Sequence, residues 1–410
     1  MAANLDGIRV LDFTQVLSGP TATRYLAEMG AMVIKVEAPP GGDITRSSPR
    51  IRDGRSGYFV NANRGKRSIC VNLKDPRGTD LMLSMLPTID VVIQNFSPGA
   101  IERLGLGWNE LSAIKPDLIM CSISGFGHTG PLSHLPGYDG AAAAYSGMLA
   151  INGELDRPPA LPGAPMGDVL TGTAAAAGIL SALFHRERTG EGQHIQTSIL
   201  DSYLSAHDTA FQTLALTDGD IVQGRAGSQH PVISGYGVFP VADGDVFIGA
   251  GADRHWHDLC DAMGRQDLYD PSHKWSVRTT RDGEILEVNA LIAAWSVTLT
   301  KHAAIDLLQR HRVPCGPILE VDEVAALPEF HESGHLRTVT DPILGSLTLP
   351  SFGLRSSQTD MGFDTEAPHL GEHNRDVLLD LSGGAEAYAE LVDAGVIHDP
   401  EPSARPSRQR

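Results

Sequence analysis

Asp168 is the residue of this chain whose surroundings are best suited to covalent chemistry. It ends the Gly- and Pro-rich run Leu161–Asp168, and an Ala-rich segment typical of a helix follows it. Backbone N–H groups and the helix dipole favour negative charge at the N-terminus of a helix. A capping Asp meets the same requirement, so the position predicts either a helix cap or a reactive carboxylate.

Two further groups of polar residues lie next to predicted strands. Residues 95–97 follow a predicted strand at Asp90–Ile93, with Arg103 beyond them. They are either ligand contacts at the carboxyl end of the strand or an ordinary turn before a helix. The basic cluster at 63–67 precedes another strand. It predicts either a site that binds phosphate through charge-assisted hydrogen bonds or a solvated loop.

Other patterns are less specific. The run Gly125–Gly130 matches G-x-G-x-x-G, but Pro131 follows it in a loop, so the pattern favours a Gly-rich active-site loop over a dinucleotide fingerprint. His255 and His257 have no third ligand at a recognisable spacing, and Asp253 predicts a helix cap, so no metal site is predicted. The sequence has neither a Gly-x-Ser-x-Gly elbow nor a Walker A motif.

The elements that must position these residues alternate between strands and helices in the first half of the chain. Such alternation predicts a doubly wound α/β sheet, in which ligands bind at the carboxyl ends of the strands. The predicted strands are 8–13, 32–36, 68–73, 90–93, 118–122 and 194–198. The predicted helices are 20–29, 78–85, 104–114, 171–186 (rich in Ala and expected to be buried) and 200–216.

The pattern changes from about residue 224. Short strands with Gly-rich turns are predicted at 236–240 and 246–249, and helices at 256–263, 284–295 and 302–311. This pattern predicts a smaller α+β domain. Short strands return after residue 333, as at 345–349, and a tail rich in Pro, Ser and Arg is expected to be disordered.

Composition narrows the class of protein. A length of 410 residues is enough for two domains or for one large interrupted domain, and 41% hydrophobic with 20% charged residues is typical of a globular protein. The net charge of −18 argues against nucleic-acid and anionic-membrane partners. Four isolated cysteines predict reduced thiols. Since the N-terminus has no signal-peptide pattern and no segment is long enough to span a membrane, a cytoplasmic location is expected.

An ordered set of motifs resembles the family III CoA-transferases, the CaiB/BaiF family that includes formyl-CoA transferase. No single motif is decisive, but the set covers nearly the whole chain. It comprises Leu5-Asp-Gly-Ile-Arg-Val-Leu-Asp-Phe-Thr14, Ser18-Gly-Pro20, Val33-Ile-Lys-Val-Glu37, Gly41-Gly-Asp43, Asn63-Arg-Gly-Lys-Arg-Ser68, Asn95-Phe96, Pro98-Gly99, Pro136-Gly-Tyr-Asp139, Ser146-Gly-Met148, Gly167-Asp168, Thr189-Gly190, Gly192-Gln193 and Leu370-Gly-Glu-His-Asn374.

The resemblance implies an interlocked homodimer, in which each chain threads the ring formed by the other. It implies a large Rossmann-like domain, built from both ends of the chain, with a smaller α+β domain inserted. The expected boundaries are 1–200 for the first part of the large domain, 201–225 for a linker helix, 226–330 for the small domain, 331–395 for the return to the large domain and 396–410 for a disordered tail.

The resemblance also assigns roles to residues. Asp168 would be the nucleophile that accepts an acyl group from acyl-CoA as a mixed anhydride and then carries CoA as a thioester before an acceptor acid takes it. Acyl-CoA and a small organic acid are the expected substrates, with no permanently bound cofactor. The expected CoA contacts are Leu17, Ser18, Val71, Asn72, Leu73, Lys74, Asn95, Phe96, Ser97, Arg103, Pro136, Gly137, Tyr138 and Asp139.

Two departures from relatives bear on the reaction. Racemases of α-methylacyl-CoA carry a His where this chain has Tyr138, and a Tyr with a free pKa of about 10 is a poor base. The tetraglycine loop of formyl-CoA transferase is absent. The segment from Gly227 to Phe239 resembles dicarboxylate-using members, and His230 within it is a candidate acceptor contact. Racemisation or isomerisation of an acyl-CoA, and binding without catalysis, remain the alternatives.

Overall fold

The computed structural model describes residues 3–48, 51–359, 361–362 and 365–399. Contacts within the chain divide it into two compact units. The large unit takes its described residues from Met1–Ser146, Gly163–Ala206 and Pro328–Arg410, and the inserted unit comprises Gly147–Pro162 and His207–Leu327. The inserted unit therefore also takes residues 147–162, which the predicted boundaries left in the large domain.

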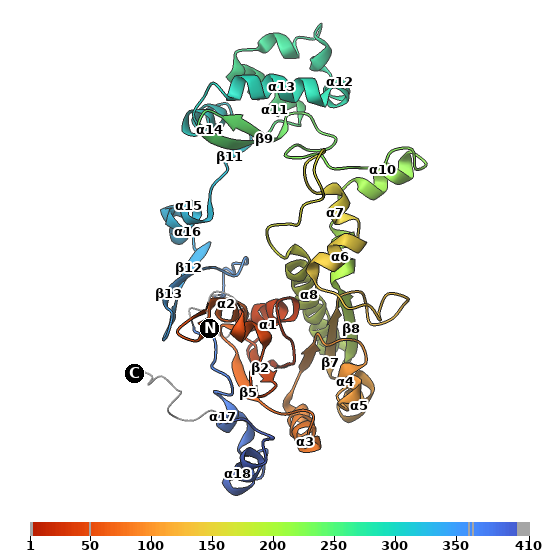
Figure 1. The fold of residues 1–410 in the computed structure, drawn as a ribbon, viewed down its shortest axis with the longest axis vertical. Helices are drawn as coiled ribbons and strands as arrows, with labels where there is room; N and C mark the ends of the chain where they lie inside the picture. Colours follow the sequence, from red (N-terminus) through yellow and green to blue (C-terminus); the bar gives the residue numbers. More distant parts are fainter. Residues whose placement is uncertain (1–2, 49–50, 360, 363–364, 400–410) are drawn as a thin grey trace. The chain divides into compact units, whose positions relative to one another are not determined.

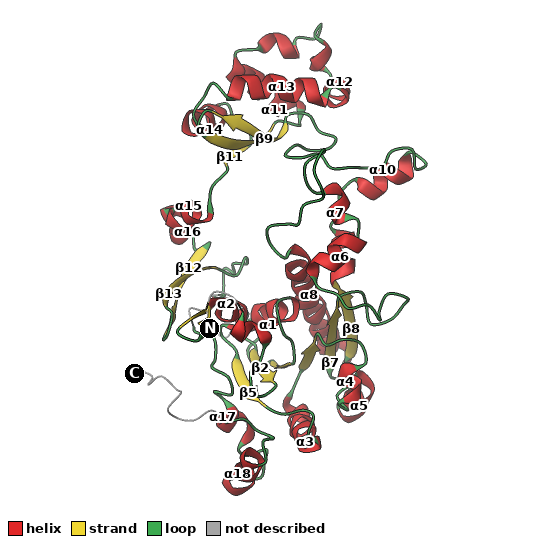
Figure 2. Ribbon diagram, in the orientation of Figure 1, coloured by secondary structure: helices red, strands yellow, loops and turns green. Residues whose placement is uncertain are grey.

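A six-stranded parallel sheet forms the centre of the large unit (Figures 1 and 2). Its strand order is β5-β2-β1-β6-β7-β8. The order reverses direction between β1 and β6, so the loops after these two neighbouring strands open into one crevice. The strands are β1 (Arg9–Asp12), β2 (Met32–Glu37), β5 (Arg67–Cys70), β6 (Val91–Gln94), β7 (Ile119–Ser124) and β8 (Gln193–Ser198). This arrangement confirms the predicted doubly wound α/β class.

Helices pack on both faces of this sheet and elsewhere in the large unit. They are α1 (Ser18–Glu28), α2 (Gly57–Asn63), α3 (Pro76–Met85), α4 (Ala100–Arg103), α5 (Trp108–Ile114), α6 (Asp139–Tyr145), α8 (Met166–Thr189), α9 (Ile199–Ser205), α16 (Pro328–Glu332), α17 (Asn374–Leu378) and α18 (Ala385–Asp393), with 3-10 turns at η1 (Ile44–Ser47) and η2 (Leu86–Thr88). Two hairpins complete the large unit, β3 (Ile51–Arg52) with β4 (Arg55–Ser56) and β12 (Leu336–Asp341) with β13 (Gly345–Pro350).

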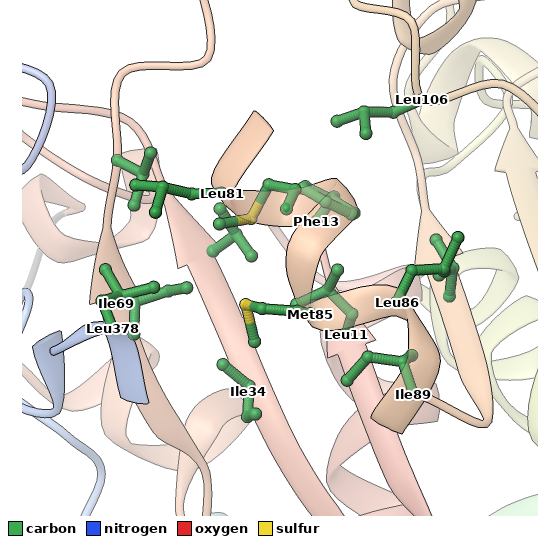
Figure 3. Close-up of a cluster of buried hydrophobic side chains, with 14 of the residues drawn as sticks. Leu11, Phe13, Ile34, Ile69, Leu81, Met85, Leu86, Ile89, Leu106 and Leu378 are labelled. Atoms are coloured by element: carbon green, nitrogen blue, oxygen red, sulfur yellow. The ribbon is translucent and has the colours of Figure 1, made fainter. Parts of the chain in front are cut away.

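Alternating side chains of the strands build two separate cores. On one face, Leu11 and Ile34 pack with Met85 of α3 and Leu378 of α17 (Figure 3). On the other face, Val10 and its neighbours pack with apolar residues of α1 and α8. Because successive strand residues point to opposite faces, a short parallel strand buried on both sides is apolar at nearly every position. This explains why these strands could be predicted from short apolar runs.

The inserted unit has its own sheet and core. Its antiparallel sheet has the order β11-β10-β9. Its core lies around the buried Trp256. The elements are α7 (Met148–Ile151), α10 (Ala210–Leu216), β9 (Tyr236–Val241), β10 (Gly244–Gly249), α11 (Asp253–Met263), η3 (Gln266–Tyr269), η4 (Lys274–Ser276), α12 (Arg278–Gly283), α13 (Ile285–Ser296), α14 (Lys301–Arg310), β11 (Cys315–Pro317) and α15 (Val321–Ala326).

Several predicted elements were wrong in detail. The long helix expected at 200–216 is two helices, α9 and α10, and the chain passes into the inserted unit between them, at His207. The cap of α11 is Ala252, and Asp253 is its first helical residue. The disordered tail expected from residue 396 was wrong for its first residues, because Val396 and Ile397 are buried and Ile397 bridges Val71. The rest of the predicted tail, 400–410, lies outside the described residues.

Helix α8 is only half buried, although the Ala-rich segment was expected to be a buried helix. Among the described residues, it is the one helix that by length and composition could cross a membrane, and α13 with α14 would also qualify if their 115° bend were ignored. Helix α8 packs against α1, α9 and strands β7 and β8, as the core helix of an α/β sheet does. Its opposite face is exposed, including Leu170 and Phe184.

Candidate active site

Two of the predicted ligand loops, those after β1 and β6, are joined directly by hydrogen bonds. Asn95, just after β6, accepts a hydrogen bond from the backbone N–H of Gln15 at 2.8 Å and donates one to the Gln15 carbonyl at 2.7 Å. This reciprocal pair ties the loop after β6 to the loop that joins β1 to α1. Leu17 and Ser18 follow directly, at the start of α1.

Asp168 lies in the first turn of α8, so the prediction of a carboxylate at a helix N-terminus is confirmed. Its backbone N–H donates a hydrogen bond to Asp139 Oδ1 at 2.9 Å, and the hydroxyl of Tyr203 donates to Asp139 Oδ2 at 2.8 Å. Asp139 is therefore a hydrogen-bond acceptor for the helix that carries Asp168. Gly167 is needed beside it, since an added Cβ would lie 2.2 Å from the Tyr203 ring.

Packing of α1 against α8 brings Ser18 to Asp168. The two helices approach closely at Gly172, where an added Cβ would lie 2.6 Å from the Ser18 carbonyl oxygen and 2.7 Å from Thr21 Cβ. Glycine in the middle of a helix normally costs stability, so its presence here has a packing reason. The N-terminal turns of α1 and α8 therefore face the same point in the crevice.

The electrostatic setting of Asp168 favours a reactive carboxylate. Burial raises the pKa of Asp168 to about 6, and the Asp139 carboxylate adds to the rise, whereas hydrogen bonds from the hydroxyl and backbone N–H of Ser18 oppose it. Burial, followed by the charges of Asp168 and Asp43, raises the pKa of Tyr58 to about 12. At neutral pH Asp168 is therefore mostly ionised, with a higher basicity than a free Asp, and Tyr58 is a neutral phenol.

The other predicted CoA contacts fall into two groups. Pro136–Asp139 lies beside the end of β7, because an added Cβ on Gly125 would lie 3.1 Å from the Gly137 backbone. Tyr138 in this loop is 75% exposed, so no packing fixes its ring near Asp168. Asn95 to Ser97 and Arg103 follow β6 and reach α4.

The second group lies at a different strand. Val71, Asn72, Leu73 and Lys74 follow β5, which is separated from β1 by β2. Val71 is fully buried and Leu73 packs against the core, whereas Lys74 is exposed. Only backbone groups of this segment, the Asn72 amide and the Lys74 ammonium are therefore available to a ligand in solution.

In the basic cluster at 63–67, the side chains of Arg64 and Lys66 are buried and paired with carboxylates. They therefore form neither a phosphate site nor a solvated loop, and both predictions were wrong for these two residues. Arg64 is buried and forms an ion pair with Glu28 at 2.8 Å. Lys66 is buried and forms one with Asp12 at 3.1 Å. Arg64 therefore lies in the interior at the last residue of α1, and Lys66 lies there beside the last residue of β1.

Two other patterns have structural explanations. The Gly125–Gly130 loop does not open a helix, since the next helix in the sequence is α6 at Asp139, so the dinucleotide fingerprint is excluded there. His255 and His257 lie in the first turns of α11. Across the described ranges, no group of three or more His, Cys, Asp or Glu side chains is arranged to hold a metal ion.

His230 belongs to the inserted unit. Its backbone N–H donates to the Tyr236 carbonyl at 2.9 Å, and its ring contacts the Tyr236 ring edge to face, with centroids 5.4 Å apart. Burial lowers the pKa of His230, so its imidazole is neutral at pH 7. Its assignment as an acceptor contact stays a prediction.

Sequence reasoning missed three features of the site. Tyr58 and Tyr203 come from separate elements and no motif points to them. Val16, just before Ser18, has a positive φ of 68°, which is uncommon for a β-branched residue. The positive φ could not have been found from the sequence, because Val is a residue type that normally avoids this conformation.

Comparisons with known proteins agree with this architecture. The profile of CoA-transferase family III matches residues 5–374. Succinyl-CoA–D-citramalate CoA-transferase of Chloroflexus aurantiacus is 37% identical, covering 95% of this chain and 97% of that protein. Succinyl-CoA:mesaconate CoA-transferase of Haloarcula marismortui is 39% identical over 92% and 96%. Succinyl-CoA:glutarate CoA-transferase of Mus musculus is 34% identical over 97% and 91%.

Two solved structures are similar over nearly the same span. A CaiB/BaiF family protein from Brucella suis has a TM-score of 0.79 and 32% identity, covering 93% of this chain and all of that one. The protein Rv3272 from Mycobacterium tuberculosis has a TM-score of 0.81 and 30% identity, covering 92% and 99%. The likeness extends through both units of the fold.

Proposed function

This chain belongs to CoA-transferase family III and is an enzyme of the CoA-transferase type, and from that premise we propose that it moves CoA from succinyl-CoA to a small dicarboxylic acid. The similar relatives from Chloroflexus, Haloarcula and mouse support this choice, since the names of all three join succinyl-CoA to a dicarboxylic acid. The absent tetraglycine run supports it as well, because it separates this chain from formyl-CoA transferase.

The observation that carries the mechanism is Asp168 in the first turn of α8, with its pKa raised by burial and by Asp139. In the first step an Asp168 oxygen bonds to the thioester carbonyl carbon, the C–S bond breaks, and CoA leaves as the thiolate. Backbone N–H groups of the Gly-rich loops beside the site can stabilise the oxyanion that forms during this attack. The product is a mixed anhydride between Asp168 and succinate.

The remaining steps return the enzyme to its starting state. CoA thiolate attacks the aspartyl carbonyl of the anhydride, releasing succinate and leaving CoA as a thioester of Asp168. The acceptor carboxylate then attacks this thioester, which restores a mixed anhydride and frees the thiolate. A final attack by the thiolate on the acceptor acyl carbon yields the new acyl-CoA and the Asp168 carboxylate.

Binding of CoA is assigned to the loops after β1, β5, β6 and β7. This assignment is supported by the hydrogen bonds that join Asn95 to Gln15 in the β1–α1 loop and Asp139 to Asp168. Lys74 and Arg103 supply positive charge to a chain with a net charge of −18, and CoA carries phosphates. No permanently bound cofactor takes part in these steps, and acyl-CoA is a substrate.

The interlocked homodimer also belongs to the proposal. The exposed face of α8 supports it, because small and apolar residues recur there at helical spacing and monomers rarely expose such a stripe. The face is formed by Leu170, Thr173, Ala174, Ala177, Ser181 and Phe184. We assign a cytoplasmic location on the four free cysteines, as reduced thiols are usual there.

The decisive test is to trap the intermediate. Protein incubated with succinyl-CoA and hydroxylamine should yield a hydroxamate at Asp168, identified by peptide mass spectrometry. Asp168→Ala should still fold and bind CoA esters, yet lose transfer and trapping. Retained turnover by Asp168→Ala would contradict the mechanism.

The acceptor is tested with a panel of acids. Purified protein, succinyl-CoA and single acids should give new CoA esters with dicarboxylates such as glutarate, mesaconate and citramalate in preference to formate and oxalate. The racemase alternative predicts instead that deuterium from solvent enters the α-carbon of an acyl-CoA with no acceptor acid present. That result without trapping at Asp168 would replace transfer by epimerisation.

A further inference from the structure

The loop from Thr14 to Ser18 carries the residue that contacts Asp168, and it is held in an unfavourable conformation. Val16 has a φ of 68°, in the left-handed region that β-branched residues avoid. Such a conformation persists only where surrounding contacts hold it, and it is found most often at functional sites. The contacts that hold Val16 therefore bear on how Ser18 is placed.

A buried ion pair holds both sides of this loop. Lys35 and Asp43 lie 2.9 Å apart, and both side chains are fully buried. Lys35 Nζ donates a hydrogen bond to the Thr14 carbonyl oxygen at 2.6 Å. Asp43 Oδ1 accepts one from the backbone N–H of Val16 at 3.3 Å. The residues before and at the strained position are thus each tied to one member of the pair.

The pair is itself fixed by rigid elements. Lys35 lies in β2, next to Asp12 of β1 in the parallel register. The Asp43 backbone N–H donates to Glu37 Oε2 at 3.0 Å. Asp43 Oδ1 also accepts from the backbone N–H of Thr45 at 3.0 Å and from its hydroxyl at 2.8 Å. The ion pair thereby holds the Thr14–Ser18 loop in a fixed position relative to the sheet.

Stability alone does not account for this pair. Removing two charges from water is costly, and replacing a buried ion pair by apolar residues of similar volume is often neutral or stabilising. The two charged groups instead form hydrogen bonds with backbone groups of one loop, the Thr14 carbonyl and the Val16 N–H. A buried pair away from this loop, Glu28 with Arg64, lies at the other end of α1, about 15 Å from Ser18 along the helix.

We propose that Lys35 and Asp43 are positioning residues for acyl transfer: they hold Val16 in the left-handed conformation so that Ser18 faces Asp168. This inference rests on the proposed function, in which Asp168 is the nucleophile. The pair does not contact the substrate, and its effect passes through the loop. A merely structural pair would affect stability without a specific link to Val16.

The test measures how fast hydroxylamine traps the acyl group on Asp168 in a single turnover with saturating succinyl-CoA. The double variant Lys35→Met/Asp43→Leu removes both charges together, so no unpaired ion is left buried. We expect its trapping rate to fall by about 100-fold, a loss typical of a misplaced catalytic geometry, with little change in the dissociation constant for the CoA ester.

Rescue separates positioning from stability. Adding Val16→Gly to the double variant should raise its trapping rate by at least about tenfold. Glycine takes a positive φ without strain, and Asn95 still holds Gln15. The matched control Glu28→Leu/Arg64→Met removes a buried pair that does not contact the Thr14–Ser18 loop, and it should keep the trapping rate. If Lys35→Met/Asp43→Leu does not fold, as judged by circular dichroism, Asp43→Asn with and without Val16→Gly gives the same comparison.

Three results would overturn the inference. They are an unchanged trapping rate in the double variant, a lost rate that Val16→Gly does not recover, and an equal loss in the Glu28/Arg64 control. Failure of the unmodified protein to form any hydroxamate at Asp168 would instead overturn the proposed function. The two failures are therefore distinguishable within one set of measurements.

Discussion

At the scale of single residues, Asp168 shows a conflict between stability and reactivity. Its pKa is raised to about 6 by burial and by the neighbouring Asp139 charge, so ionising it costs the folded state free energy. The same environment keeps the carboxylate basic and poorly solvated, which suits a nucleophile. The enzyme is thus expected to be less stable with its active carboxylate than without it.

Replacing Asp168 by Asn should therefore stabilise the protein at alkaline pH. The folded pKa of about 6 lies above the model value of 3.8, so the folded state holds the proton more tightly and loses stability as pH rises through this window. At pH 8 the variant should gain roughly 2–3 kcal/mol in unfolding free energy, measured by urea denaturation. The gain should shrink as pH falls toward 4.

The control for this measurement is Asp220→Asn, which removes one exposed charge from the same protein. It should show no comparable gain at pH 8. A stability difference between Asp168→Asn and the unmodified protein that is the same at pH 5 and pH 8 would contradict the linkage argument.

The pH dependence of activity should report the same group. Because the nucleophile must be ionised, kcat/KM should decline below pH of about 6. Asp139→Asn removes one of the two causes that raise the pKa of Asp168, so the acidic limb should move to lower pH. Tyr203→Phe keeps both carboxylates, so the acidic decline of its kcat/KM should not move to lower pH. A limb unaffected by Asp139→Asn would show that another group controls the decline.

Residue types predicted only part of the site. Asp168 was found because Gly- and Pro-rich sequence before an Ala-rich run is readable as a helix start. The readings of Arg64 and Lys66 failed because charge in a sequence does not show whether a partner such as Glu28 or Asp12 lies opposite in the interior. The φ of Val16 was equally invisible, because the backbone N–H groups of Gln15 and Val16 donate to residues distant in the sequence, Asn95 and Asp43.

At the scale of elements, the contact of α1 with α8 sets the distance between Ser18 and Asp168. Gly172→Ala should therefore destabilise the protein by about 1–3 kcal/mol, since the new methyl group would meet the Ser18 carbonyl oxygen at 2.6 Å. In an exposed helix the same change would stabilise by about 1 kcal/mol. The unfolding free energy measured by urea denaturation and the trapping rate at Asp168 should both be lower for this variant.

Gly178→Ala in the same helix is the matched control. Its added methyl group would face Ile195 Cγ2 at 3.2 Å, a side-chain atom that can shift, so a smaller loss of stability is expected. Equal stability of Gly172→Ala and the unmodified protein would show that α1 and α8 can separate without cost.

The strands of the large sheet and the helices packed on it were predictable because burial on the two faces of the sheet produces regular apolar patterns in the sequence. The break between α9 and α10 was not, since residues 200–216 keep a helical pattern while the chain crosses between two units at His207. Similarly, residues 147–162 have a composition that fits either unit, and tertiary contacts decide where they belong.

At the scale of the whole molecule, the exposed face of α8 predicts association. Ala177→Glu places a charge on this face, and burying it against a second copy would be costly. We expect the unmodified protein to sediment as a dimer of 43.7 kDa chains and Ala177→Glu to shift toward the monomer. Ala303→Glu, an equally exposed helical alanine in α14, should leave the mass unchanged. A compact monomer of the unmodified protein in small-angle scattering would contradict the dimer.

The burial of Val396 and Ile397 has a consequence for how the protein is made. The backbone N–H of Asn72 donates to the Val396 carbonyl, and Ile397 bridges Val71 beside the edge strand β5. The packing of Val71 and Asn72 in the large unit is therefore completed only after residues 396–397 have been synthesised, whereas the inserted unit ends at Leu327. Since domains generally fold as units during synthesis, the inserted unit should acquire protease resistance on stalled ribosomes before the large one does.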